Sequence, residues 1–301
     1  CCLSSLNLET YDEWKDEPNF IEDVMRFLDN VLTDFINRAP DSFKDAKYSA
    51  MRERSVGLGV MGFHSFLQKK QIPLESVMSK VWNNKIFKNI QTNVNKASKV
   101  LAEERGSCPD AQEYGFKERF SNKTAIAPTA SISIICGGAS PGVEPIAANS
   151  YTHKTLSGSY NVRNKYLKEI LKTHGKDDEE TWSTITTNQG SVCHLDFLSD
   201  HEKDVFKTAF ELNQRWIVEL GADRTPYISQ AQSINIFLPA DVHKRELHQI
   251  HFQAWKKGLK SLYYCRSKSI QRAENINNSL SAKKIIKDSK EEDYEECLSC
   301  Q

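Results

Sequence analysis

The apolar residues of this chain recur at helical spacing in three long segments. In residues 18–36, and again in residues 82–104, apolar side chains return every three or four positions, a pattern typical of amphipathic helices. Residues 241–257 repeat the pattern, and Gly258 is a suitable helix stop. We therefore predict helices over these three segments.

The second half of the chain alternates between helical and strand-like patterns. Ser199 and Glu202 have the spacing of a capping box, and we expect the helix that they begin to run through Leu220. Residues 233–238 (SINIFL) alternate as a strand does, and residues 259–265 (LKSLYYC) follow the last helix as another strand. Strands that alternate with helices predict an α/β fold with parallel strands.

The apolar pattern fades after about Glu274. The residues beyond it are mostly charged or polar, so they bury too little apolar surface to offset the entropy lost on folding. We therefore expect a folded domain over residues 1–273 and a flexible tail over residues 274–301.

Composition excludes several classes of protein. The 40 Lys and Arg residues balance the 40 Asp and Glu residues, so no net field attracts nucleic acid or an anionic membrane. No apolar run is long enough to span a bilayer. The 8 cysteines are too sparse in 301 residues for a disulfide scaffold, which favours a reducing, cytoplasmic compartment.

The segment GLGVMG, Gly57–Gly62, matches the G-x-G-x-x-G motif of dinucleotide-binding sites. That motif needs a strand before it, and the preceding residues, KDAKYSAMRERS, are polar and helix-prone. We interpret the glycines as small residues that let a helix pack closely against a neighbour.

The segment APTASISI, residues 127–134, has a different chemistry. An apolar stretch meets Pro128, after which Thr129 begins what can be a helix with free N–H groups and hydroxyls, a combination that suits phosphate. An ordinary N-cap turn uses the same residue types. The following GGASPGVEP supplies a second glycine-rich turn, which contains Glu144.

Tyr263 and Tyr264 end the last predicted strand. Paired tyrosines of this kind usually belong to a core or an interface, and neighbours in a strand point to opposite faces. By themselves they indicate no chemistry.

The chain ends in YEECLSCQ, in which Cys297 and Cys300 form a CxxC pair. A zinc site normally needs a second such pair, which is missing, and a thioredoxin-type site would begin a helix inside a βαβ unit. A mobile dithiol that carries electrons between an internal disulfide and an external reductant fits the placement better. About 25 flexible residues reach roughly 25–30 Å, enough to enter a cleft.

Several segments together closely resemble the catalytic large subunit of class I ribonucleotide reductase, most nearly the bacterial and bacteriophage aerobic type. They run in order across essentially the whole chain: CCLSSLNL, ERSVGLGVMGF, GSCP, PTASISIICGGASPGVEP, YISQAQSINIF, SLYYCRSK and CLSC. The resemblance implies a ten-stranded α/β barrel of two five-stranded parallel halves, of which this chain holds the second. It also implies reduction of ribonucleoside diphosphates to deoxyribonucleoside diphosphates by radical chemistry.

The resemblance assigns redox roles to three cysteines. Cys1 corresponds to one of the two cysteines that reduce the substrate and become a disulfide. Cys297 and Cys300 correspond to the shuttle that reduces this disulfide again and is itself reduced by thioredoxin or glutaredoxin. Cys2 receives no role. We expect the remaining cysteines to be buried packing residues: Cys108, Cys136, Cys193 and Cys265.

The resemblance also assigns binding and relay roles. The loop that binds the substrate diphosphate corresponds to Thr129, Ala130, Ser131 and Ile132. Tyr263 and Tyr264 correspond to a stacked pair that passes the radical from the small subunit to the active site. Because neighbours in a strand alternate, stacking both rings requires a local bend.

One segment of the family pattern is missing. No N-x-C-x-E sequence, which carries the radical cysteine in the family, occurs in this chain. We therefore expect one part of a split or truncated subunit, inactive without an N-terminal part. It should bind no metal or cofactor itself, because the radical comes from a metal-containing small subunit. The expected location is the cytoplasm, or the host cytoplasm for a viral protein.

Other hypotheses remain open. A cobalamin-dependent class II reductase shares the phosphate loop and the tail cysteines, although the tyrosine pair favours class I, because a cobalamin enzyme generates its radical in place. A non-catalytic half-barrel that only docks the small subunit is a second alternative. A zinc-binding module is a third, which a metal assay would identify.

We predict that Cys297→Ser or Cys300→Ser abolishes turnover driven by thioredoxin or glutaredoxin. A single thiol stops at a mixed disulfide with the disulfide that it attacks, and a second thiol is needed to complete the reduction. A pre-reduced complex should still complete one turnover, and a small dithiol should partly restore cycling. The measurement is deoxyribonucleotide formed per active site. Normal cycling of both variants with the protein reductant would show that the shuttle assignment is wrong.

Overall fold

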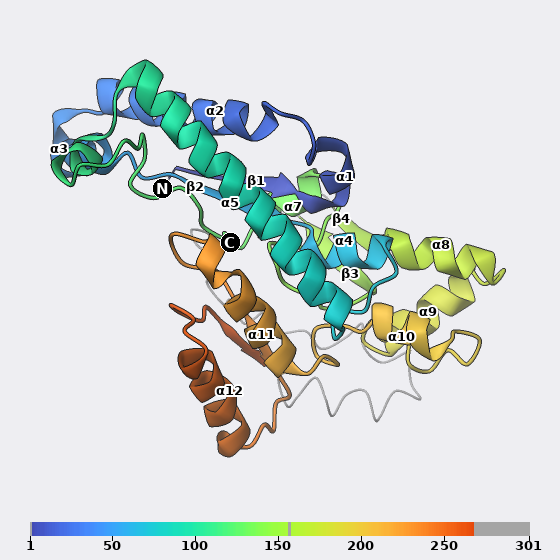
Figure 1. Cartoon of the computed structure of the whole chain (residues 1–301). Coiled ribbons are helices and arrows are strands. Elements are labelled where there is room, and N and C mark those ends of the chain that lie inside the picture. Colours follow the sequence, from blue (N-terminus) through green and yellow to red (C-terminus); the bar gives the residue numbers. More distant parts are fainter. Residues whose placement is uncertain (1, 156–157, 268–301) are drawn as a thin grey trace.

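The structure, a computed structural model, describes residues 2–155 and 158–267 (Figure 1). Cys1, the predicted boundary at residue 273, and the tail with Cys297 and Cys300 lie outside the described residues. The strands are β1 (Leu3–Asn7), β2 (Gly57–Met61), β3 (Ser150–Thr155), β4 (Gly158–Arg163), β5 (Ile236–Leu238) and β6 (Cys265–Ser267). The helices of the first half are α1 (Tyr11–Trp14), α2 (Phe20–Arg38), α3 (Lys44–Glu53), α4 (Phe63–Lys69), α5 (Val77–Arg105), α6 (Pro109–Glu113) and α7 (Ala130–Ile135). Those of the second half are α8 (Lys165–Thr173), α9 (Glu179–Thr187), α10 (Asp200–Val205), α11 (Gln214–Arg224) and α12 (Lys244–Lys256), and short 3-10 turns cover Leu8–Thr10, Asp41–Phe43 and Thr225–Tyr227.

Parallel pairing joins extended segments from the whole length of the chain. β1 pairs with β2 in parallel, and β5 pairs in parallel with β6. Between these pairs, two parallel bridges link Leu58 to Thr124 and Ile126 to Gln232. Strands and helices alternate along the chain, so the predicted α/β fold is confirmed.

β2 corrects our interpretation of the GLGVMG segment, which forms a fully buried strand and not a helix. A Cβ atom on Gly59 would lie 2.2 Å from the carbonyl oxygen of Ala125, and one on Gly57 would lie 2.4 Å from Leu3 Cδ2. As we inferred, glycine is needed here because neighbouring segments approach closely. The element that packs closely is, however, a strand.

The three helices predicted from periodicity are present as α2, α5 and α12. Each places its buried residues on one face, as an amphipathic helix does. The capping box at Ser199 and Glu202 is also present, but its helix α10 ends at Val205 and does not run through Leu220. A turn in which Glu211 accepts hydrogen bonds from Thr208 interrupts the helix, and Asn213 caps α11 anew.

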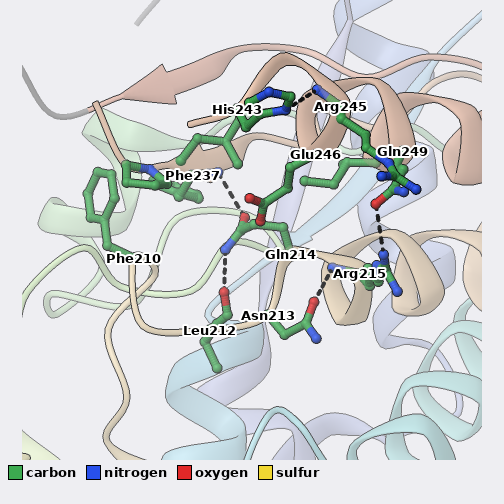
Figure 2. A pocket seen from close by; sticks show the side chains of 13 residues that line it. Phe210, Leu212, Asn213, Gln214, Arg215, Phe237, His243, Arg245, Glu246 and Gln249 are labelled. Carbon is green, nitrogen blue, oxygen red and sulfur yellow. Dashed lines mark hydrogen bonds between the residues drawn. The ribbon is translucent and has the colours of Figure 1, made fainter. Parts of the chain in front are cut away.

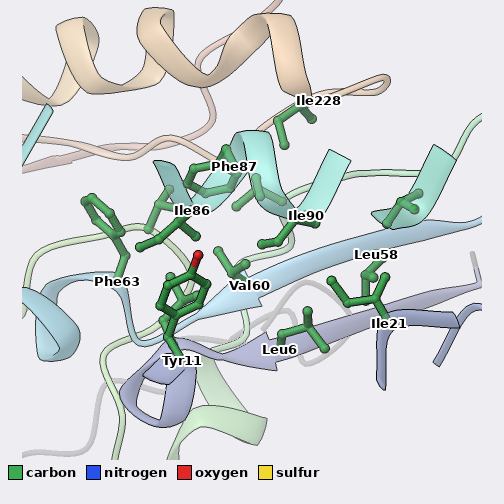
Figure 3. Packing of buried hydrophobic residues seen from close by; sticks show 14 of the residues in the cluster. Leu6, Tyr11, Ile21, Leu58, Val60, Phe63, Ile86, Phe87, Ile90 and Ile228 are labelled. Carbon is green, nitrogen blue, oxygen red and sulfur yellow. The ribbon is translucent and has the colours of Figure 1, made fainter. Parts of the chain in front are cut away.

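The largest core lies between the first strands and α5, which crosses β1 and β2 in Figure 1. Figure 3 shows Leu6, Leu58 and Val60 of the strands facing Phe87 and Ile90 of α5. Burying side chains of this size stabilises the fold by about 1.5–3 kcal/mol each. Two smaller cores lie within α8–α10 and between α11, β5 and α12.

The structure also contains an antiparallel hairpin of β3 and β4, which the hydrophobic pattern did not predict. Its register places Ser150 opposite Arg163. Tyr151 and Tyr160 are exposed, so those hairpin residues whose burial is described do not show the half-buried alternation from which strands are predicted.

The prediction for the remaining cysteines is correct only for Cys108, which is buried. Cys136, Cys193 and Cys265 are exposed, contrary to our expectation. Cys136 follows the mostly exposed helix α7, and Cys265 begins β6, all of whose residues are exposed. A cysteine's burial depends on what packs over it, which its type alone does not determine.

A buried carboxylate ties the first helices together. Asp29 of α2 has no exposed side-chain surface and accepts hydrogen bonds from Arg54, Arg105 and Arg119. Burial raises the pKa of the Asp29 carboxyl, but hydrogen bonds from Arg119, Arg105 and Arg54 and the Arg54 charge outweigh it, and the pKa lies below its usual value.

We predict that Asp29→Asn destabilises the fold by about 3–5 kcal/mol, because it leaves three guanidinium groups without their carboxylate. Chemical unfolding measures this, with exposed Asp34→Asn on the same helix as the control. Because the folded pKa is lowered, the stabilisation is full above the unfolded pKa of about 3.9 and is lost as the pH falls through the folded value. Equal stability of the two variants at neutral pH would contradict the prediction.

Candidate functional site

Several loops meet at one edge of the row of extended segments that pair in parallel. β1 and β2 both end at this edge, and Asn7 Nδ2 donates a hydrogen bond to the carbonyl of Cys136 in the loop beyond α7. Gly62, directly after β2, donates its N–H to the carbonyl of Ser140 in the same loop. In parallel sheets, ligands bind at the carboxyl ends of the strands, so this edge is the candidate site.

The loop from Pro128 to Glu144 is held in one conformation by its own residues and by α4. Thr129 has left-handed backbone angles, with a φ of 55°, which is unusual for a β-branched residue. Its Oγ1 accepts a hydrogen bond of 2.7 Å from the buried N–H of Gly142. Ser65 and Ser140 exchange two hydrogen bonds, each from a backbone N–H to the other hydroxyl.

This geometry leaves the start of α7 open. Thr129 is the N-cap residue, but its hydroxyl is engaged by Gly142 and does not cap the helix. The next residues, Ala130, Ser131 and Ile132, are exposed. Backbone N–H groups in the first turn of a helix have no partner within the helix, and at these exposed residues they face solvent.

The rings of Tyr263 and Tyr264 lie against one another directly before β6. Their ring centroids lie 4.1 Å apart with 52° between the ring planes, and the two residues are 41% and 43% exposed. The Arg266 guanidinium lies 5.8 Å from the centroid of the Tyr264 ring. The rings are therefore in contact with one another and open to solvent at once.

A β-bulge explains how adjacent residues place their rings side by side. The N–H of Tyr263 donates to the carbonyl of Ile234 at 2.9 Å. The N–H of Ile236 donates to the carbonyl of Tyr264, also at 2.9 Å. In a regular parallel ladder, one residue makes both of these bonds, one through its N–H and one through its carbonyl. Here Tyr263 makes the first bond and Tyr264 makes the second, so two residues lie opposite Asn235. The extra residue supplies the local bend that brings the two rings into contact, although they lie tilted and not stacked as the resemblance implied.

Two residues that the motif analysis did not assign connect the loop to the tyrosine pair. Asn235 Nδ2 donates a 2.7 Å hydrogen bond to Glu144 Oε1, and both residues are buried. Burial raises the pKa of the Glu144 carboxyl above its usual value, although the Asn235 hydrogen bond and the Arg266 charge oppose the shift. The signal in the sequence was a lone Asn inside the apolar strand SINIFL.

The cysteine at the other end of β1 has a structural environment. Cys2 Sγ donates to the carbonyl of Leu28, and its own carbonyl accepts from Gly57. Burial raises the pKa of the Cys2 thiol, which keeps it protonated. Its neighbour Cys1 lies outside the described residues, so the structure does not place it relative to the loop or the tyrosines.

A pocket of about 470 Å³ lies elsewhere, between α11, β5 and α12 (Figure 2). Gln214 spans one wall, since its Oε1 accepts from the N–H of Phe237 and its Nε2 donates to the carbonyl of Leu212. Arg215 donates to Gln249 across the pocket. None of the described candidate residues lines it, so the pocket is separate from the loop and the tyrosine pair.

Comparison with known proteins identifies the family. Residues 1–118 and 110–265 match the family described as ribonucleotide reductase, barrel domain. The chain therefore belongs to this ribonucleotide reductase family. The match covers both the loop and the tyrosine pair, and it confirms the resemblance drawn from the sequence motifs.

Individual relatives extend this result. The ribonucleoside-diphosphate reductase large subunit of Invertebrate iridescent virus 6 is 50% identical, over 98% of this chain and 33% of that protein. The large subunit of Invertebrate iridescent virus 3 is 44% identical, over 92% of this chain and 44% of that protein. The solved structure of the Actinobacillus ureae class Id ribonucleotide reductase alpha subunit is 41% identical with a TM-score of 0.83, over 89% of this chain and 50% of that chain. The chain thus spans between a third and a half of these reductase subunits.

Within the described part of the chain, no three His, Cys, Asp or Glu side chains are grouped as a metal site requires. None of the helices described is long and apolar enough to cross a membrane.

We predict that Thr129→Val loosens the loop, because it removes the oxygen that accepts the buried Gly142 N–H while keeping the branched shape. An unsatisfied buried N–H costs about 1–3 kcal/mol. Hydrogen exchange at the Gly142 amide should become faster in this variant and stay near wild type in Thr129→Ser, which keeps the hydroxyl. Unchanged exchange in Thr129→Val would contradict the role of this bond.

Proposed function

We propose that this chain is the C-terminal part of the catalytic large subunit of a class I ribonucleoside-diphosphate reductase. The complete enzyme converts ribonucleoside diphosphates to deoxyribonucleoside diphosphates. The observation that carries the proposal is the contact of the Tyr263 and Tyr264 rings, with centroids 4.1 Å apart, next to a glycine-rich loop in a chain of the reductase family. A class II enzyme generates its radical in place and has no need of such a pair.

The fold supports the second half of a ten-stranded barrel. Within the described residues, β1 and β6 each pair with a strand on one side only. In a closed barrel every strand pairs on both sides, so an N-terminal part would supply the missing neighbours. The shares of 33% and 50% of the relatives' lengths leave room for such a part.

The loop would hold the substrate diphosphate. The N–H groups of Ala130, Ser131 and Ile132 and the Ser131 hydroxyl are the donors on offer, and all three residues are exposed. Thr129 contributes its backbone geometry, since its own hydroxyl binds Gly142. The helix dipole adds to the attraction for a phosphate at this turn.

The tyrosine pair would relay the radical from a metal-containing small subunit. A phenol loses an electron and its proton together, so two phenols in contact pass the radical by exchanging both. Both residues are partly exposed, at 41% and 43%, so a radical donor or acceptor can reach them. The metal belongs to the small subunit, and this chain supplies the path.

The cysteines outside the described residues would supply electrons. Replacing the 2′-hydroxyl by hydrogen releases water and consumes two electrons and two protons. Cys1, with a cysteine of the N-terminal part, would provide them and become a disulfide. Cys297 and Cys300 would reduce that disulfide by thiol exchange, and thioredoxin or glutaredoxin would then reduce the tail, in a cytoplasmic setting.

We predict that Tyr263→Phe or Tyr264→Phe stops turnover, because a phenyl ring has no phenolic proton to lose and is much harder to oxidise. The assay is deoxyribonucleoside diphosphate formation by this chain combined with an N-terminal part, the small subunit and a dithiol. Binding of the nucleoside diphosphate should be unchanged in both variants.

Tyr48→Phe, an exposed tyrosine on α3, serves as the control and should keep full activity. Activity near wild type in either variant of the pair would refute the relay. Turnover by the 301-residue chain with small subunit and dithiol, but no N-terminal part, would refute the assignment as a partial subunit.

A further inference from the structure

The bulge at the tyrosine pair creates a donor that the ladder does not use. In a regular parallel strand the N–H of Tyr264 would bond to the carbonyl of Ile234, but Tyr263 occupies that acceptor. A bulge leaves its extra residue unpaired, and an unpaired backbone N–H is costly away from water. The N–H of Tyr264 is therefore left to bond to an acceptor outside the ladder.

Asn235 provides the acceptor from its side chain. Its Oδ1 accepts the N–H of Tyr264 at 3.0 Å, and Asn235 is the residue that the bulge faces. Asn235 is only 1% exposed, so the acceptor of this bond is buried, whereas Tyr264, which donates, is 43% exposed. One side chain thus satisfies the amide that the bulge releases.

Glu144 fixes which way round the Asn235 amide lies. Asn235 Nδ2 donates to Glu144 Oε1 at 2.7 Å, so the opposite end of the amide, Oδ1, faces Tyr264. Rotation by 180° would place an oxygen against the Glu144 oxygen and an NH₂ group against the Tyr264 N–H, losing both bonds. The orientation is therefore set by the carboxyl group, from the loop that also contains Thr129.

We propose that Asn235, oriented by Glu144, is a positioning residue that holds the bulge and with it the contact between the rings of Tyr263 and Tyr264. This inference rests on the proposed relay function. Radical transfer between the rings depends on their contact, and a regular strand would separate them to opposite faces. Asn235 acts through the backbone of Tyr264 and touches no reacting atom.

The experiment compares four variants in the reconstituted complex of this chain, its N-terminal part and the small subunit. Asn235→Ala removes the acceptor, and Glu144→Leu removes the group that orients it. Glu144→Gln keeps an oxygen that accepts from Nδ2. Asn213→Ala is the matched control, since Asn213 also accepts a backbone N–H, from Arg215, at the start of α11.

Two quantities are measured for each variant: hydrogen exchange at the Tyr264 amide, resolved to single residues, and kcat and KM for a ribonucleoside diphosphate. In Asn235→Ala we expect exchange at Tyr264 to accelerate about tenfold, the effect of losing one hydrogen bond. We expect kcat to fall on the order of 100-fold, as for a misplaced reacting group, with KM near wild type. Glu144→Leu should show the same pattern, and Glu144→Gln and Asn213→Ala should resemble wild type in both quantities.

Three results would overturn the proposal. Slow exchange at Tyr264 in Asn235→Ala would mean that another group holds the amide, and fast exchange with unchanged kcat would mean that the bond does not position the rings. A fall in kcat in Glu144→Gln equal to that in Glu144→Leu would also refute the orienting role. Absence of turnover in the wild-type mixture would instead refute the proposed function, while the exchange measurement would still decide whether Asn235 holds the bulge.

Discussion

Parallel backbone hydrogen bonds between segments far apart in the sequence are the constraint on which this structure depends. β1, β2, the stretch around Thr124–Ile126, the stretch from Gln232 through β5, and β6 are connected in this way. The middle of the row is the tightest, because Gly59 brings β2 so close to Ala125 that a single Cβ would collide with a backbone oxygen. Every loop of the candidate site begins or ends on one of these segments, so its position follows from this pairing.

Buried polar side chains fix the positions of the helices against the extended segments that pair in parallel. Asp29 forms ion pairs with three arginines from separate segments, and these pairs orient α2 and the end of α5. Arg224 of α11 also joins separate segments, because its Nε donates a hydrogen bond to Gln232 and its Nη1 donates one to Asn83 of α5. Burial lowers the pKa of the Arg224 guanidinium to about 9. The Phe63 and Phe87 rings lie beside this guanidinium. Such groups are costly unless fully bonded, so they specify one arrangement of the helices.

The candidate site combines a rigid loop with a locally irregular strand. The loop departs from ordinary backbone geometry at Thr129, and the strand departs from regular pairing at Tyr263 and Tyr264. In both places a side chain compensates for the departure: Thr129 Oγ1 binds Gly142, and Asn235 Oδ1 binds Tyr264. Irregular backbone that is fully hydrogen-bonded is typical of functional sites, since it sets side chains in positions that regular elements cannot provide.

Features that depend on neighbours along the chain could be predicted from the residues alone. The periodicity of α2, α5 and α12, the capping box at Ser199 and the helix start after Thr129 are local, and each is present. The motifs also determined the family, because they combine residue types in an order that spans the chain. That Gly57–Met61 forms a strand became clear only from its contacts with distant segments, since burial on all sides removes the alternation that marks a strand. The exposure of Cys136, Cys193 and Cys265, the bulge and its Asn235 partner likewise depend on contacts between segments distant in sequence, which no local pattern records.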